Sequence, residues 1–163
     1  MQKEESDREK ARTELQRYMF YFERYENHEK SSKFAQKLLP QLKQKIELLH
    51  EIKSYPMGEL TFLEEACKEC IRCHNVLKWT YVYGYYCIDE KNKIRKEQFE
   101  YSQTDLERFC DTLHKMVETP LDAYLDPNII DRSPFYKFKG TLVSYFEATK
   151  KYYKSLVKFI QES

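Results

Sequence analysis

Helical spacing of apolar residues is the feature that most constrains how this sequence can fold. Between residues 63 and 88, positions separated by three or four carry one continuous series: Leu63, Cys67, Cys70, His74, Leu77, Tyr81, Gly84 and Ile88. Such a heptad pattern is typical of helices that pack side by side, and Gly84 would let a neighbouring backbone come close. Comparable series occur within 15–52, 99–116 and 142–159, so the pattern predicts helices over most of the chain.

Turn-forming residues are scarce and cluster at a few places. The 163 residues include only 3 Gly and 5 Pro, too few for the many turns of a β sandwich or barrel. Breaks are expected at 55–58, at the polar segment 89–93, and in 120–134, a loop that holds three of the prolines. The sequence therefore predicts an all-α fold, an elongated bundle of about four long helices in a single domain over 1–163.

The first helix is expected to be unusually long, from residue 5 to 54, with 1–14 as a charged N-terminal extension. Pro40 lies inside it, and because proline has no backbone N–H, we expect a kink there or two helices end to end. The segment 26–33 is polar on all sides. We therefore expect it to be the least packed part of the helix and the easiest to open.

Charge and hydropathy exclude several classes of protein. The 28 basic and 27 acidic residues give a net charge of +1, whereas a general nucleic-acid binder usually carries a clear basic excess. No run of 18 apolar residues could span a membrane, and residues 1–14 lack the apolar stretch of a signal peptide. Five cysteines without a secretory signal indicate reduced thiols, so we expect a location in the cytoplasm, with the nucleus as the alternative.

One cysteine-rich string has the spacing of a metal or haem site. Cys67, Cys70, Cys73 and His74 match patterns used by iron–sulfur centres and covalently attached haem. However, the string lies in the middle of a predicted helix, and three of its members are consecutive positions of the heptad series. We interpret these residues as core, with His74 hydrogen-bonded to a neighbouring helix, and expect no metal or cofactor. A small metalloprotein is the alternative, which elemental analysis would distinguish.

No catalytic constellation is recognisable. Cys110 lies beside Asp111 without the signature of a nucleophile, and the isolated glycines at 58, 84 and 140 cannot form a phosphate-binding loop. We therefore expect neither enzymatic activity nor a small-molecule substrate for this chain. Six lysines give the last helix a basic bias, which suits a solvated face or contact with an acidic partner: Lys137, Lys139, Lys150, Lys151, Lys154 and Lys158.

Two blocks of aromatic residues, 18–22 and 79–86, place large rings on every side of a helix. A helix that is apolar all round must be covered all round. Either both blocks lie at the crowded centre of the bundle, or part of their surface meets another domain.

The same blocks carry a family resemblance. Residues 15–28 (LQRYMFYFERYENH) resemble the opening of the Ariadne domain of RING-between-RING ubiquitin ligases. Residues 73–86 (CHNVLKWTYVYGYY) are similar to a second block of that family, and 99–107 (FEYSQTDLE) to a third. The three blocks occur in the family's order over residues 15–113.

The resemblance implies a helical domain that follows the catalytic RING-like domain, folds back over its catalytic cysteine and keeps the ligase inactive. It also implies release by a partner, typically a neddylated cullin–RING ligase, and zinc only in upstream RING modules. The occluding residues of the family fall on Phe34, Ala35 and Asp111. Asp111 lies off the apolar face of its predicted helix, so we expect it to face solvent.

Two departures from the family pattern affect this reading. Ala35 replaces a glutamate, so the inhibitory contact is expected to be weaker or differently built. His74 replaces an arginine of the family pattern. A helical protein-interaction scaffold unrelated to ubiquitin transfer is the alternative function, because it shares every compositional feature of the chain.

Overall fold

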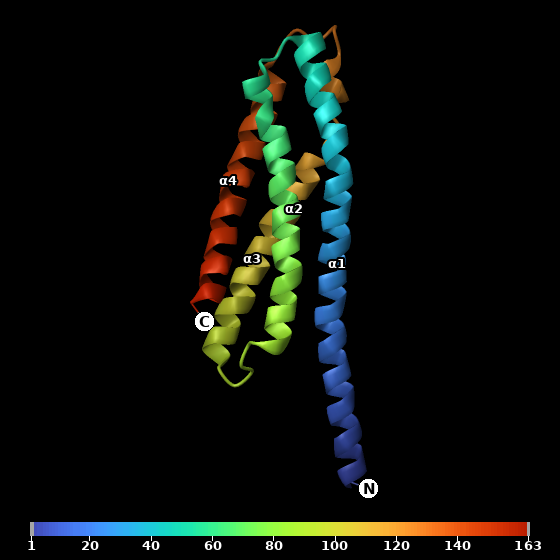
Figure 1. Cartoon of the computed structure of the whole chain (residues 1–163), viewed down its shortest axis with the longest axis vertical. Helices are drawn as coiled ribbons and strands as arrows, with labels where there is room; N and C mark the ends of the chain where they lie inside the picture. Colours follow the sequence, from blue (N-terminus) through green and yellow to red (C-terminus); the bar gives the residue numbers. More distant parts are fainter. Residues whose placement is uncertain (1, 163) are drawn as a thin grey trace.

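The computed structural model describes residues 2–162, and every long element in that range is a helix. The elements are α1 (Gln2–Lys53), α2 (Met57–Tyr86), α3 (Lys93–Val117), the 3-10 turn η1 (Asp122–Leu125) and α4 (Ser133–Gln161). Figure 1 shows α1 and α2 running antiparallel along the long axis, while α3 and α4 pack against α2 and each other. The predicted all-α, elongated bundle is confirmed.

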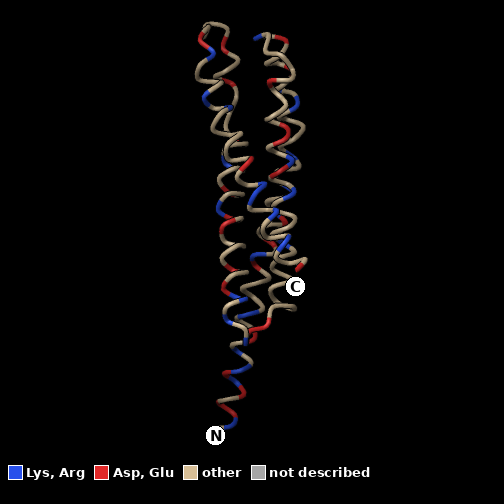
Figure 2. Tube along the Cα trace, turned by 90° about the vertical axis from the view of Figure 1, so that its left-hand side faces the viewer, with Lys and Arg blue, Asp and Glu red and all other residues tan. Residues whose placement is uncertain are grey.

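The helix α1 passes through Pro40 without interruption, so the alternative of two helices end to end is wrong (Figure 1). Ala35 and Leu42, on either side of the proline, are buried. Packing of these residues holds the helix in place across the missing backbone hydrogen bond. Residues 2–14 are exposed and extend beyond the other helices, with charges of both signs along them (Figure 2).

The heptad series predicted within α2 forms the centre of the bundle. All eight of its positions are buried. One core cluster joins this helix to the C-terminal half of α1 and the start of α4, and a second joins it to α3 and the end of α4. None of the helices in residues 2–162 has the length and apolarity needed to cross a membrane.

The room left by Gly84 is filled by side chains and not by a backbone, contrary to expectation. A Cβ atom at this position would lie 3.1 Å from Tyr21 Cε1 and 3.2 Å from Phe99 Cε1. Gly84 therefore lets the rings of α1 and α3 approach α2 closely.

The connection between α3 and α4 is anchored by one aromatic residue at the start of α4. Phe135 is buried, and the centroid of its ring lies 4.5 Å from that of Tyr55 and 5.4 Å from that of Tyr124 in η1. Phe62 of α2 completes the cluster, with 5.9 Å between centroids. The loop thus shares one packing centre with the α1–α2 turn, α2 and α4.

The polar segment 26–33 is partly buried whereas residues 2–14 are exposed throughout, so the expectation that it is the least packed part of α1 is wrong. His28 and Ser32 are buried, with 7% and 1% of their surface exposed. The Ser32 hydroxyl donates to Asn75 Oδ1 at 2.7 Å, and Lys78 pairs with Glu29. Because α2 offers matching polar groups, this segment buries polar side chains without leaving them unpaired.

Candidate interaction surfaces

Phe34 lies on the outer face of α1 with 54% of its surface exposed. Its ring stacks on the imidazole of His114 from α3, with 5.8 Å between centroids. The two rings line a shallow pocket, called here the Phe34 pocket, together with Lys30, Ser31 and Glu118. The stack holds an apolar ring at the surface in a fixed position.

Glu118 is a member of this pocket that sequence reasoning missed. It follows Asp111 by seven residues, which is two helical turns, so both acids share one face of α3. This seven-residue spacing is the signal by which the sequence could have revealed Glu118. The family resemblance draws attention to Asp111 but not to Glu118.

Ala35 is buried, with 1% of its surface exposed, and its carbonyl oxygen accepts a contact from Cys67 Sγ at 3.4 Å. Neighbouring residues on a helix point in directions about 100° apart, so Phe34 faces outward while Ala35 faces α2. The side chain of Ala35 has no surface to offer another domain in this conformation. Of the three expected contact residues, Phe34 and Asp111 are exposed in this structure and Ala35 is not.

Asp111 is exposed, and it lines a polar pocket beside the Phe34 pocket. This Asp111 pocket is formed by Glu23, Arg24, Asn27, His28, Ser31, Glu107 and Asp111. Ser31 belongs to both pockets, so the two are continuous along α1. Partial desolvation raises the pKa of Asp111, and the neighbouring Glu107 carboxylate adds to the rise.

Three histidines connect these pockets through the interior of the bundle. His28 Nδ1 lies 3.1 Å from His74 Nδ1, and His74 Nε2 lies 2.8 Å from His114 Nδ1. At the far end, Glu107 Oε1 lies 2.8 Å from His28 Nε2 and accepts from the Tyr81 hydroxyl. Burial, together with the two neighbouring imidazoles, lowers the pKa of His74 to about 3, so this residue is neutral at physiological pH.

The cysteines of the 67–74 string pack into the core. Burial raises the pKa of Cys67 to about 11 and raises that of Cys70 as well, so both remain protonated thiols. Cys73 Sγ lies 3.5 Å from Glu69 Oε1. Within residues 2–162, no group of three or more His, Cys, Asp or Glu side chains is arranged to hold a metal ion.

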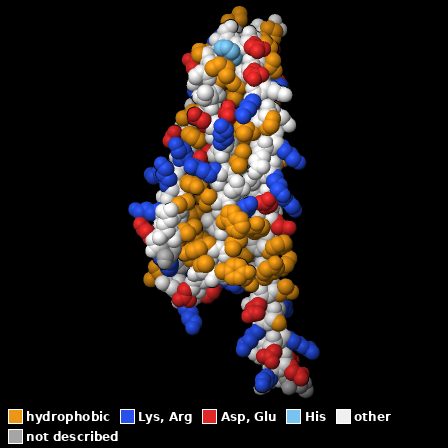
Figure 3. Space-filling model, viewed as in Figure 1, with side chains coloured by type: hydrophobic (Ala, Val, Ile, Leu, Met, Phe, Trp, Pro, Cys, Tyr) orange, Lys and Arg blue, Asp and Glu red, His pale blue; other side chains and the backbone are white. Residues whose placement is uncertain are grey.

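A third surface feature is an aromatic groove between α1 and α2. Figure 3 shows hydrophobic side chains gathered over the half of the bundle nearest the projecting N-terminus. The groove is lined by Tyr18, Tyr21, Phe22, Tyr25, Trp79, Tyr81, Val82, Tyr85 and Tyr86. Trp79 and Tyr86 are 57% and 74% exposed. The outer rings of both aromatic blocks are therefore open to contact, and only the inner rings are covered by the bundle.

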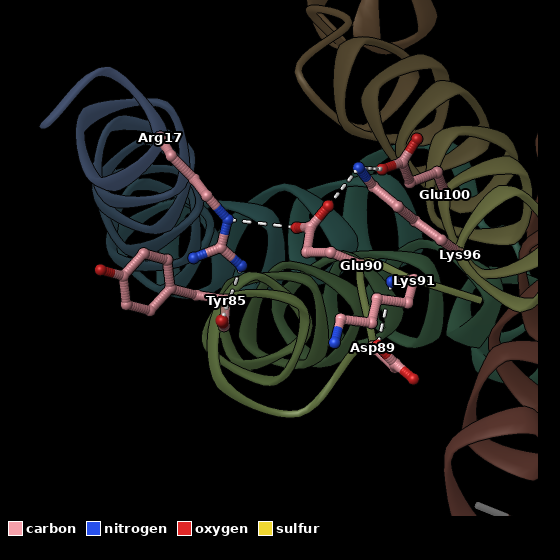
Figure 4. Close-up of polar contacts among 7 residues, drawn as sticks. All are labelled: Arg17, Tyr85, Asp89, Glu90, Lys91, Lys96 and Glu100. Carbon is pink, nitrogen blue, oxygen red and sulfur yellow. Dashed lines mark hydrogen bonds and ion pairs between the residues drawn. The ribbon is translucent and has the colours of Figure 1, made fainter. Parts of the chain in front are cut away.

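Arg17 contacts Tyr85, one of the residues that line this groove (Figure 4). Its guanidinium donates to Tyr85 O at 2.8 Å and to Glu90 Oε1 at 3.1 Å, and it lies over the Tyr85 ring, 4.4 Å from the centroid. The other oxygen of Glu90 accepts from Lys96 Nζ at 2.6 Å. One side chain of α1 thus binds the end of α2 and, through Glu90, the start of α3.

Substituting Arg17→Gln should loosen the exposed part of α1 without unfolding the bundle. The loss of a partly exposed ion pair and a cation–π contact, together about 1 kcal/mol, predicts amide exchange about fivefold faster over residues 15–22. Hydrogen exchange followed by mass spectrometry measures this, with Arg8→Gln in the exposed extension as the matched control. Equal exchange in both variants would show that Arg17 does not fasten the helix.

The fold is an all-α bundle whose thiols pack in the core and whose surface carries two adjoining pockets and an aromatic groove. A family model described as the Ariadne domain matches residues 16–133, so the chain belongs to the Ariadne domain family.

Named relatives agree with this assignment. The chain is 35% identical, over 96% of its length, to "Probable E3 ubiquitin-protein ligase ARI7" of Arabidopsis thaliana, and it covers 28% of that protein. It is 36% identical over 95% of its length to "Probable E3 ubiquitin-protein ligase rbrA" of Dictyostelium discoideum, covering 29%. It is 37% identical over 66% of its length to "Ankyrin repeat and IBR domain-containing protein 1" of Mus musculus, covering 10%. The chain thus spans less than a third of these relatives.

Proposed function

We propose that this chain is the regulatory domain of a RING-between-RING ubiquitin ligase. In this proposal it covers the catalytic RING-like domain of the same polypeptide and takes part in docking to a neddylated cullin–RING ligase. Membership of the Ariadne family and the ligase names of its relatives support the proposal. The chain itself carries no catalysis, because thioester chemistry and zinc belong to the upstream RING modules.

The observation that carries the proposal is the exposed ring of Phe34. Interface energy concentrates in a few aromatic anchors, and an anchor that is already held in place loses little conformational entropy on binding. His114 supplies that support by stacking, and Asp111 and Glu118 place carboxylates in the two adjoining pockets. Although Ala35 replaces the acidic residue of the family pattern, Glu118 still provides an acid beside Phe34.

The aromatic groove supports the second candidate function, a helical scaffold unrelated to ubiquitin transfer. Its open rings suit an apolar segment of a partner and require no catalytic domain in the same polypeptide. The two candidates use different surfaces, so substitutions at the Phe34 and Asp111 pockets distinguish them.

The test is the double substitution Phe34→Ala and Asp111→Ala in the full-length parent ligase. If these residues hold the catalytic domain in place, removing an anchor and a hydrogen-bonding group should raise basal ubiquitin transfer about fivefold or more. Ubiquitin-transfer assays without a cullin partner measure the effect. Binding of the parent to a neddylated cullin–RING ligase is measured in parallel.

Tyr101→Ala is the matched control, because Tyr101 is a 72% exposed ring on α3, remote from both pockets. It should leave basal transfer unchanged. Melting curves of each variant establish that the domain is folded. Wild-type transfer by a folded double variant would exclude these residues from an inhibitory contact and favour the scaffold.

A further inference from the structure

A chain of polar contacts runs from Glu107 through the buried His28 and His74 and through His114 to Glu118, and it has one proton fewer than it has contacts. Its five groups meet at four contacts of 2.8, 3.1, 2.8 and 2.9 Å. Each contact needs one proton to become a hydrogen bond. A neutral imidazole brings one N–H and an ionised carboxylate brings none, so the three histidines supply three protons for four contacts.

The Glu107 end fixes where those three protons lie. Glu107 already accepts from the Tyr81 hydroxyl, so as a carboxylate it accepts a second bond from the Nε2–H of His28. The Nδ1 atom of His28 is then an acceptor, and His74 must donate to it from Nδ1. The Nε2 atom of His74 is in turn an acceptor, so His114 donates from Nδ1.

This order leaves His114 Nε2 without a proton, and the geometry at this atom agrees. His114 Nε2 is buried and has no hydrogen-bond partner among the described residues, although Glu118 Oε1 lies 2.9 Å away. Two acceptors therefore face each other. The Glu118 side chain is 44% exposed, so its carboxylate is free to turn into line with a proton on Nε2.

We propose that His114 Nε2 and Glu118 form a proton-binding site, which takes up the first proton of the histidine chain as the pH falls. The resulting imidazolium completes the fourth hydrogen bond and pairs with the Glu118 carboxylate. It also lies beneath the exposed ring of Phe34, so proton uptake turns their stack into a cation–π contact.

Other ionisable groups face the chain from each of the three helices that enclose it. From α1, α2 and α3 these are Glu23, Arg24, Lys30, Cys70, Tyr81, Asp111 and Lys115. Cys70 and Tyr81 are neutral, because burial raises the pKa of both groups. His74 does not compete for the proton, because its burial keeps it neutral. His28 and His114 are the two histidines at the ends of the chain. Only His114 has an unprotonated ring nitrogen that faces a carboxylate.

The test is a ¹⁵N NMR titration of the imidazole groups in the 163-residue chain. His114 should become doubly protonated at a higher pH than His28 and His74, and His74 should show a single protonated nitrogen at neutral pH. Protonation of His28 or His74 before His114, or of all three together, would overturn the proposal.

Glu118→Gln sharpens the test, because an amide N–H can donate to His114 Nε2 and complete the chain with no added proton. The protonation midpoint of His114 should fall by about half a pH unit, as expected for loss of a partly exposed ion pair. Glu100→Gln, an exposed glutamate earlier in α3, is the matched control and should leave the midpoint unchanged. A midpoint that does not move in Glu118→Gln would also overturn the proposal. These measurements require no ubiquitin transfer, so they test the proton-binding site independently of the proposed function.

Discussion

Replacing Phe135 with alanine is expected to lower the free energy of unfolding by about 3–5 kcal/mol, the range for a buried phenylalanine. Only 1% of its surface is exposed, and its ring touches those of Tyr55, Phe62 and Tyr124. These partners belong to the α1–α2 turn, to α2 and to η1. One truncation therefore removes a packing centre shared by the α1–α2 turn, α2, η1 and α4, and the rigid rings around it can collapse only partly into the cavity.

Urea denaturation of the wild-type and variant chains measures this loss. Tyr101→Ala, which removes a ring of similar size from an exposed position on α3, should change the stability by less than about 0.5 kcal/mol. A loss below about 1 kcal/mol for Phe135→Ala would mean that the loop and the start of α4 are not held by this cluster.

The parts of the fold that the sequence predicts are those set by apolar periodicity. The heptad series of α2 marks buried positions, because a residue that returns to one face every three or four steps must be covered if it is apolar. Phe135 escapes this reasoning. It lies next to Pro134 at the very start of α4, and its partners Tyr55 and Tyr124 come from a turn and a loop, where no periodicity connects them.

The polar interior of the bundle could not be predicted from periodicity at all. The segment 26–33 reads as solvated because its residues are polar, but the partners that bury it, such as Asn75 and Glu107, lie more than 40 residues away in sequence. Of the expected contact residues Phe34 and Ala35, only Phe34 is exposed. Adjacent residues on a helix point about 100° apart, and here the smaller side chain turns toward the core.

The buried position of His74 predicts that the bundle loses stability in mild acid. Its pKa is about 3 in the folded chain against an ordinary value of 6.5, so between these values the unfolded chain binds a proton that the folded chain does not. Its contribution to stability is complete above about pH 6.5 and is lost as the pH falls toward 3. The loss is about 1.4 kcal/mol per pH unit, or about 2–3 kcal/mol between about pH 6.5 and about pH 4.5.

The comparison that isolates this effect is between the wild-type chain and His74→Gln, studied by urea denaturation across the same pH range. Glutamine can hydrogen-bond to both His28 and His114 but cannot titrate, so other acid-sensitive groups largely cancel in the difference. As the pH falls, the free energy of unfolding of the wild-type chain should decrease relative to that of the variant by about 1.4 kcal/mol per pH unit. Parallel pH profiles would show that His74 is not held neutral.

At neutral pH, His74→Ala should lower the free energy of unfolding by about 1–3 kcal/mol, because it removes a packed ring and leaves two imidazole nitrogens without partners.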